Sequence, residues 1–172
     1  MKRSFFLKSF QGYVLITLLL AALVFLFSTS IIRNHYIGTL SSGLETLDTA
    51  LLLRLTPLVE KNAVDSLDAI AKELGAAINT RITVIDPGGR VLADSKENPH
   101  DMDNHRWRPE IAHALEGQTG TSIRFSRTVK QDMLYVAVPI SKDGTIIGVV
   151  RSSLFLDDIN TLLNTLRTRI LV

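Results

Sequence analysis

The sequence predicts an α+β fold, with a transmembrane helix and a long N-terminal helix followed by a five-stranded antiparallel sheet and its flanking helices. Three observations predict it. No charged side chain lies between Lys8 and Arg33, and leucines recur at helical spacing after that stretch. From Arg81 onward, short runs of β-branched residues are separated by glycine, proline and aspartate. A chain of 172 residues is long enough for one membrane helix and one domain.

The composition excludes several classes of protein. Zero cysteines exclude a disulfide scaffold, a thiolate metal site and a cysteine nucleophile, and ten glycines with five prolines are ordinary for this length. The chain also lacks a phosphate-binding glycine loop, a serine-hydrolase elbow and a zinc-protease motif. The sequence therefore predicts no catalytic residue and no cofactor in this chain.

The first predicted element is a membrane-spanning helix. Its apolar centre, Gly12–Phe27, belongs to a stretch long enough to cross a hydrocarbon core of about 30 Å, which takes roughly 20 apolar residues. A cleaved signal peptide is the alternative, with a poor small-residue cleavage site at Ser28–Ser30. The length of the stretch favours an uncleaved span.

Basic residues before the span predict its orientation. Lys2, Arg3 and Lys8 precede it without any acidic residue before Glu45, so we expect a cytoplasmic N-terminus and an extracytoplasmic domain in a bacterial cell membrane. Leaving these three residues and Arg33 out of the count changes the net charge from +2 to −2. The domain itself is then mildly acidic, and we expect no nucleic-acid partner.

A helix with a continuous leucine face follows the span. Its leucines are spaced by four, three, four, four and three residues, as on one face of an α-helix. They are Leu40, Leu44, Leu47, Leu51, Leu55 and Leu58. This face is either the surface by which the helix packs on its own domain or the seam of a parallel homodimer, and the pattern leaves both interpretations open.

The remaining elements follow from proline, glycine and periodicity. Pro57 should kink or end the leucine helix, and Lys61-Asn62 should break the chain before a second helix. The expected elements are a helix at Asp65–Ala77, a hairpin at Ile82–Ala93, a short helix at Arg108–Leu115, strands at Thr121–Ser126, Met133–Pro139 and Thr145–Leu154, and a closing helix from Asp157. Their order and lengths match a PAS-like sensor fold.

These elements predict the division of the chain. The expected parts are a cytoplasmic N-terminus (1–11), the transmembrane helix (12–32), membrane-proximal helices (33–80), the sensor core (81–154) and a return helix (155–172). Because an apolar run begins near the end of the sequence, we expect a second transmembrane segment after it.

Several phrases together resemble a known family. They are Arg81–Ser95, Met102–His105, Arg108–Ile111, Gly120–Ser122 and Met133–Pro139. In this order they resemble the extracytoplasmic sensor region of phosphate-regulon-type (PhoR-like) sensor histidine kinases, a single-Cache or PAS-like domain. The resemblance implies a dimeric two-component receptor whose cytoplasmic kinase part, using ATP and Mg²⁺, phosphorylates a response regulator. Alternatives are a chemoreceptor, a cyclic-dinucleotide synthase, or an adaptor that binds a protein partner.

One candidate site is a polar run between the second and third strands. His100, Asp101, Asp103 and His105 offer nitrogen and oxygen ligands for a divalent metal ion. The other interpretation is structural, with Asp103, Asn104 and His105 capping the short helix and locking the loop across the sheet.

A second candidate site is an anion clamp. Arg108 precedes Pro109 at the start of the short helix, where a guanidinium could bind a carboxylate or a phosphate through two parallel hydrogen bonds. An ion pair from Arg108 to Glu110, Asp94 or Asp103 is the alternative. The resemblance adds ligand candidates in and beside the sheet, namely His105, Tyr135, Arg124, Arg151 and Ser152. The alternative is that Tyr135 is an ordinary core residue with its hydroxyl at the rim and that Arg124 and Arg151 are solvated.

Overall fold

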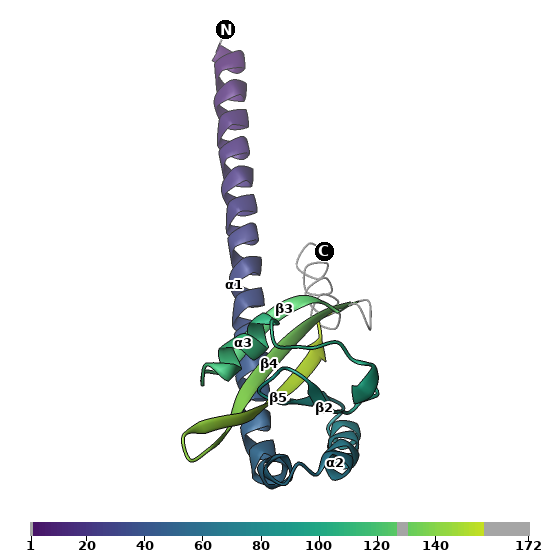
Figure 1. Ribbon diagram of the computed structural model, residues 1–172. Coiled ribbons are helices and arrows are strands. Elements are labelled where there is room, and N and C mark those ends of the chain that lie inside the picture. The colour runs from purple at the N-terminus through teal and green to yellow at the C-terminus, as the bar shows by residue number, and fades with distance from the viewer. Residues whose placement is uncertain (1, 127–130, 157–172) are drawn as a thin grey trace. The chain divides into compact units, whose positions relative to one another are not determined.

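The α+β fold predicted from the sequence is confirmed. The computed structural model describes residues 2–126 and 131–156 (Figure 1). Its elements are α1 (Lys2–Glu60), α2 (Val64–Ala77), β1 (Arg81–Ile85), β2 (Val91–Asp94), the 3₁₀ turn η1 (Pro99–Asp101), α3 (Pro109–Leu115), β3 (Gly120–Ser126), β4 (Gln131–Lys142) and β5 (Thr145–Phe155). The closing helix expected from Asp157 lies outside the described residues.

Helix α1 contributes to two compact units, residues 1–39 and 40–172. In the first unit, α1 is long and apolar enough to cross a membrane, and large apolar side chains such as Tyr13, Leu15 and Leu26 are exposed along it. Pro57 lies inside the helix, which ends three residues later, and Asn62 then turns the chain with a positive φ of 50°.

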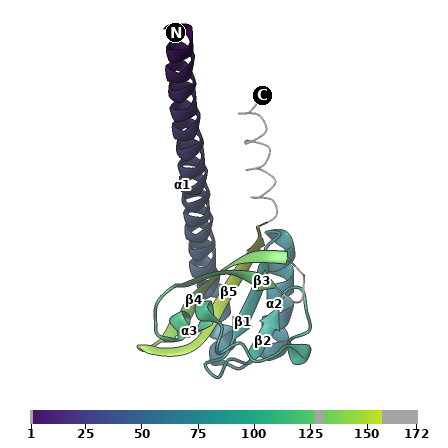
Figure 2. The ribbon, with the colours of Figure 1, turned by 90° about the horizontal axis from the view of Figure 1, so that it is seen from above.

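The second unit is built on one antiparallel sheet in the order β2-β1-β5-β4-β3. Strand β5 is central and pairs with β1 on one side and β4 on the other. Figure 2 shows β4 and β5 as the long strands of this sheet beside the shorter β1 and β2. Asp143 and Gly144 form the tight β4–β5 turn, both with positive φ, so β4 extends further toward this turn than the pattern predicted.

The two faces of the sheet carry different helices. On one face, Leu51 and Leu55 of α1 and Leu67 of α2 pack against Ile82 and Val150. On the other face, α3 packs through residues such as Ile111 and Ala114 against strand residues that include Ile85, Ala137 and Val149. Because side chains alternate along a strand, neighbouring residues of β5 face opposite helices.

The leucine face of α1 packs within the chain. Leu44, Leu51 and Leu55 are buried, while Leu40, Leu47 and Leu58 are partly buried. This is the first of the two interpretations left open by the sequence. The homodimer stays a prediction.

Candidate ligand-binding site

A polar cavity of about 320 Å³ lies on the α3 side of the sheet. Strands β1, β3, β4 and β5 and the connection between β2 and α3 supply its walls. The lining residues are Arg81, Met102, Asp103, Asn104, Arg108, Arg124, Phe125, Ser126, Tyr135 and Arg151.

The Tyr135 ring lies between two guanidinium groups of the cavity. The Arg124 guanidinium is 4.0 Å from the ring centroid, and that of Arg151 is 5.0 Å away. Tyr135 is 3% exposed, and its hydroxyl donates to the Met133 sulfur at 3.5 Å. The aromatic face therefore holds two cations close together by cation–π attraction.

Glu110 of α3 partly neutralises these two cations. Its Oε1 accepts a hydrogen bond from Arg124 Nη2 at 2.9 Å and a longer one from Arg151 Nη1 at 3.5 Å. Burial raises the pKa of Glu110, but the Arg124 hydrogen bond and the Arg151 charge outweigh it and hold the pKa below its usual value. Glu110 is therefore an ionised carboxylate with no exposed surface.

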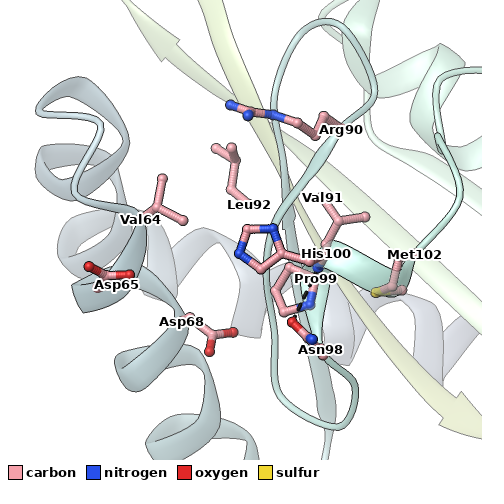
Figure 3. Close-up of a pocket in the computed structure, with 10 residues that line it drawn as sticks. All are labelled: Val64, Asp65, Asp68, Arg90, Val91, Leu92, Asn98, Pro99, His100 and Met102. Carbon is pink, nitrogen blue, oxygen red and sulfur yellow. Dashed lines mark hydrogen bonds between the residues drawn. The ribbon is translucent and has the colours of Figure 1, made fainter.

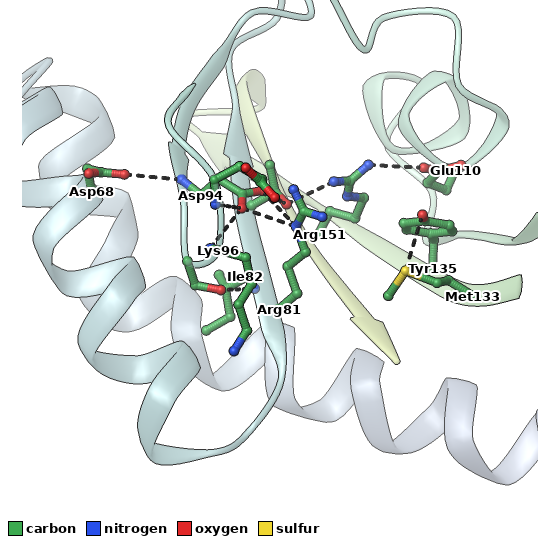
Figure 4. Close-up of polar contacts among 12 residues, drawn as sticks. Asp68, Arg81, Ile82, Asp94, Lys96, Glu110, Met133, Tyr135 and Arg151 are labelled. Atoms are coloured by element: carbon green, nitrogen blue, oxygen red, sulfur yellow. Dashed lines mark hydrogen bonds and ion pairs between the residues drawn. The ribbon is translucent and has the colours of Figure 1, made fainter. Parts of the chain in front are cut away.

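Asp94 neutralises Arg81 at the β1–β2 edge of the cavity (Figure 4). Its carboxylate accepts from Arg81 Nε at 3.1 Å, from the Thr83 hydroxyl at 2.8 Å and from the backbone N–H groups of Lys96 and Glu97. The Thr83 hydroxyl in turn accepts from Arg151 Nη2 at 2.9 Å. A continuous polar network thus joins β1, β2 and β5 beneath the cavity.

Arg108 differs from the other three arginines. Within the described part of the chain its guanidinium has no hydrogen-bonded or ion-paired partner, because Glu110 and Asp94 are taken by other arginines. Burial and the nearby charges of Arg151 and Arg124 lower the pKa of Arg108 to about 10. The guanidinium of Arg108 remains a cation that would gain from an anion.

Several buried polar atoms beside the cavity also have no partner among the described residues. They are Arg124 Nε, Arg151 Nε, Glu110 Oε2, Ser153 Oγ and His105 Nε2. Native proteins pair most buried polar groups, so such a concentration is typical of a site completed by another molecule.

The connection that carries Arg108 is fixed to the β1–β2 turn. The backbone N–H of His105 donates to the Gly89 carbonyl at 2.7 Å, and the Asn104 amide donates to the Gly88 carbonyl at 2.9 Å. Gly89 has a φ of +89°, and a Cβ atom there would collide with Arg106. These hydrogen bonds fix the loop that carries His105 and Asn104, but they join it to the β1–β2 hairpin turn. The N-cap of α3 is Arg108, with no side-chain cap.

The structure does not assemble the predicted metal site. Among the described residues, no three His, Asp or Glu side chains are grouped to hold an ion. His105 is 1% exposed, its Nδ1 lies 2.6 Å from the Asp103 carbonyl, and burial with the Arg151 charge lowers its pKa to about 3. His100 and Asp101 belong to η1, where Asp101 accepts from Asn98.

A second cavity of about 300 Å³ lies between α2 and β2 (Figure 3). Asp65, Asp68 and His100 border it, together with Arg90. Arg90 is paired with Asp86, and Asp68 accepts from Lys72 and from the Asp94 backbone. This cavity lacks the unpartnered cation of the first one.

The structure brings four of the six ligand candidates into the first cavity: Arg108, Arg124, Tyr135 and Arg151. His105 lies on the connection behind Arg108 and lines a smaller cavity. Ser152 does not join them, because it faces α1 and its backbone N–H donates to Asp48. The expectation that Ser152 accompanies Arg151 is corrected by strand alternation.

The sequence analysis did not name Arg81, and it named Glu110 and Asp94 only as alternative partners of Arg108, whereas they pair with Arg124, Arg151 and Arg81. A signal for Arg81 was present, because Arg81 and Thr83 alternate with the apolar Ile82 and Val84 in one short strand. A strand with helices on both sides has no exposed face for such polar side chains.

Several solved structures share the fold of this chain. The histidine kinase DctB sensor domain from V. cholerae aligns at TM-score 0.58 and 20% identity over 72% of this chain and 52% of that one. The ligand-binding domain of the Campylobacter jejuni chemoreceptor Tlp3 aligns at TM-score 0.57 and 20% identity over 78% and 62%. The E. coli DcuS sensor domain aligns at 0.52 and 19% over 70% and 96%.

These alignments show a shared fold, and this chain spans about half to two thirds of the first two structures. No curated protein sequence matches the chain. The single Cache-like family matches residues 49–154, which include α2, strands β1 to β4, all of β5 but its last residue, and the cavity. By its sequence and its fold, the chain belongs to the single Cache-like family of sensor domains.

Proposed function

We propose that this chain is the extracytoplasmic sensory region of a bacterial transmembrane receptor, and that its arginine-lined cavity binds a small anion, a carboxylate or a phosphate. The observation that carries the proposal is the convergence of Arg108, Arg124 and Arg151 on one cavity in which Arg108 has no carboxylate partner.

The charges of the cavity favour an anion over a neutral ligand. Four arginines face the carboxylates of Asp94, Asp103 and Glu110, which leaves one positive charge in excess. Guanidinium groups bind carboxylate and phosphate through paired hydrogen bonds, and the volume of about 320 Å³ is within the range of small-molecule sites.

For the receptor class, we propose a sensor histidine kinase working as a homodimer. The DctB and DcuS domains support this class, since DctB is a histidine kinase. The cytoplasmic part would use ATP and Mg²⁺ and act on a response regulator. A chemoreceptor is the second candidate, because Tlp3 shares the fold and its domain was crystallised with 4-methylisoleucine, which carries a carboxylate.

The mechanism requires a ligand that distinguishes two states of the domain. An anion bound by Arg108 from the connection and by Arg151 from the sheet favours the state in which these residues approach each other. The ligand then changes how the sheet holds the C-terminal part of α1. The same helix continues into the apolar stretch proposed to span the membrane.

The ligand is tested by thermal unfolding of the chain in lipid nanodiscs with sodium phosphate, sodium succinate and isoleucine. An anion at 100 times its dissociation constant should stabilise the domain by about 2.7 kcal/mol. Arg108→Ala should abolish this shift, whereas Arg90→Ala, an exposed arginine outside the cavity, should retain it. A shift that survives Arg108→Ala, or no shift with any probe, would contradict the proposal and favour a protein partner.

The receptor class is tested on the full-length protein. A kinase incorporates phosphate from ATP into its own histidine, and the stabilising anion should change that rate. A chemoreceptor would incorporate none.

A further inference from the structure

A buried carboxylate joins α1 to the central strand of the sheet. Asp48 accepts a hydrogen bond from the Ser152 backbone N–H at 3.2 Å and a second one from the Ser152 hydroxyl. Asp48 and Ser152 are both 0% exposed. The contact links residues 104 positions apart in sequence.

The carboxylate interrupts an otherwise apolar helix face. Asp48 lies one turn after Leu44 and three residues before Leu51, both of which are buried against the domain. Burial raises the pKa of Asp48 to about 8, against the opposing effects of Ser152 and Arg151. Apolar side chains often stabilise such a position as well as a buried charge does, so packing alone does not explain an aspartate here.

Ser152 is the immediate neighbour of Arg151 on β5. Their side chains point to opposite faces of the sheet, Ser152 toward α1 and Arg151 into the anion cavity. Arg151 is 1% exposed and is held on the cavity side by Thr83 and Glu110. One peptide unit therefore separates the groups that hold α1 from the groups that would meet a ligand.

We infer that Asp48 is the residue through which the cavity acts on α1, because a change in the position of Arg151 moves the two Ser152 donors that hold the Asp48 carboxylate. The inference deepens the proposed function by assigning a residue to its transmission step.

The direction of the effect follows from geometry. Thr83 and Glu110 hold the Arg151 guanidinium, and Ser152 is the next residue of β5. Whatever draws the guanidinium away from these partners, a bound anion included, shifts β5 at Ser152 and strains both hydrogen bonds to Asp48. Helix α1 is then held less firmly at this level.

The coupling is tested without a ligand, by hydrogen exchange of the 172-residue chain in lipid nanodiscs. Thr83→Val removes the hydroxyl that accepts from Arg151 while keeping the side-chain shape. Exchange of α1 amides at residues 46–52 should become about fivefold faster, as expected when about one hydrogen bond is lost. In the Asp48→Asn background the same change should stay below about twofold, because asparagine has a single side-chain oxygen and cannot accept both Ser152 hydrogen bonds as the two Asp48 oxygens do.

Two control variants and one replacement variant complete the test. Thr83→Ser retains the hydroxyl and should leave exchange unchanged. Glu45→Gln changes an exposed acid of α1 that accepts from Thr119, and in this background the Thr83→Val effect should persist in full. Should Thr83→Val lose its near-ultraviolet circular dichroism, Thr83→Ala, which removes the same hydroxyl with a smaller side chain, replaces it with the same expected results.

Equal acceleration with Asp48 and with Asn at position 48, or no acceleration with Asp48 present, would overturn the inference. Since no anion is added, a failed anion screen and a failed coupling test are separate results.

Discussion

Arg124 Nη2 lies 2.9 Å from Oε1 of Glu110, so helix α3 itself places a carboxylate against the arginines of the cavity. Glu110 has no exposed surface, and its second oxygen has no partner among the described residues. An incoming anion therefore meets cations that already share one internal carboxylate.

Glu110→Gln should destabilise the domain and strengthen anion binding. Removing the carboxylate leaves Arg124 and Arg151 without a counter-charge, at a cost of about 3 kcal/mol in the free energy of unfolding. Urea unfolding with and without phosphate or succinate measures both effects. Glu116→Gln, at an exposed acid that follows α3, is the control and should change neither. Weaker anion binding by Glu110→Gln would show that Glu110 orients the arginines and does not compete with the ligand.

Arg108→Gln should leave the domain as stable as before, or more stable by up to about 1 kcal/mol. Arg108 has no described ion-pair partner and lies in the field of Arg124 and Arg151, so its removal relieves repulsion. Thermal unfolding checks this. Arg81→Gln is the contrasting variant, because Arg81 is paired with the buried Asp94 and its loss should destabilise by about 3 kcal/mol. A strongly destabilised Arg108→Gln would mean that Arg108 is structural.

The stability of the domain should fall as the pH rises from 6.5 to 8. The pKa of Asp48 is raised from 3.8 to about 8 in the folded state, so the folded domain keeps a proton that the unfolded chain has released. The stabilisation is complete below about pH 4 and is lost as the pH rises toward 8, with a slope of at most about 1.4 kcal/mol per pH unit. Urea unfolding of the wild type and of Asp48→Asn measures it, and an equal slope in both would exclude Asp48 as its source.

On the acid side, His105 should act in the opposite direction. Its pKa is lowered from 6.5 to about 3, so its contribution is present above pH 6.5 and is lost as the pH falls through the window between 6.5 and 3. His105→Gln should flatten the stability profile in that window, whereas His100→Gln, at an exposed histidine of η1, should leave it unchanged.

Gly120→Ala should destabilise by at least about 2 kcal/mol, because a Cβ atom at the start of β3 would collide with the backbone carbonyl of Glu110. Displacing α3 also moves the Glu110 carboxylate, so the variant should bind the anion differently. Gly43→Ala is the matched control. No atom lies within 4 Å of a Cβ at that helical position, so alanine should be neutral or slightly stabilising there. A neutral Gly120→Ala would mean that α3 adjusts without loss.

Most of the fold could be predicted from the sequence because each helix and strand has a local cause. Pro57 and Asn62 mark the end of α1, and Asp143-Gly144 fits a tight hairpin turn. Arg124 and Arg151 were identifiable because a charged residue inside a strand of a two-sided domain has to meet a partner or a ligand.

The parts of the site that the sequence did not predict depend on contacts between residues that are far apart in the sequence. Glu110 looks like an ordinary acid in the first turn of a short helix, and only the packing of α3 on β3 turns it inward. Asp48 broke the leucine pattern of α1, yet the sequence did not show that Ser152 would meet it 104 positions later. The error over Ser152 itself was avoidable, because adjacent strand residues cannot share a face.

The cavity is built from two kinds of chain segment. Arg151 belongs to a strand paired on both sides, whereas Arg108 sits on the connection that is tied to the hairpin turn through His105 and Asn104. Substitutions in that connection can alter what the domain recognises without changing the register of any strand. Recognition can therefore diversify in one segment while the scaffold that reports it stays the same.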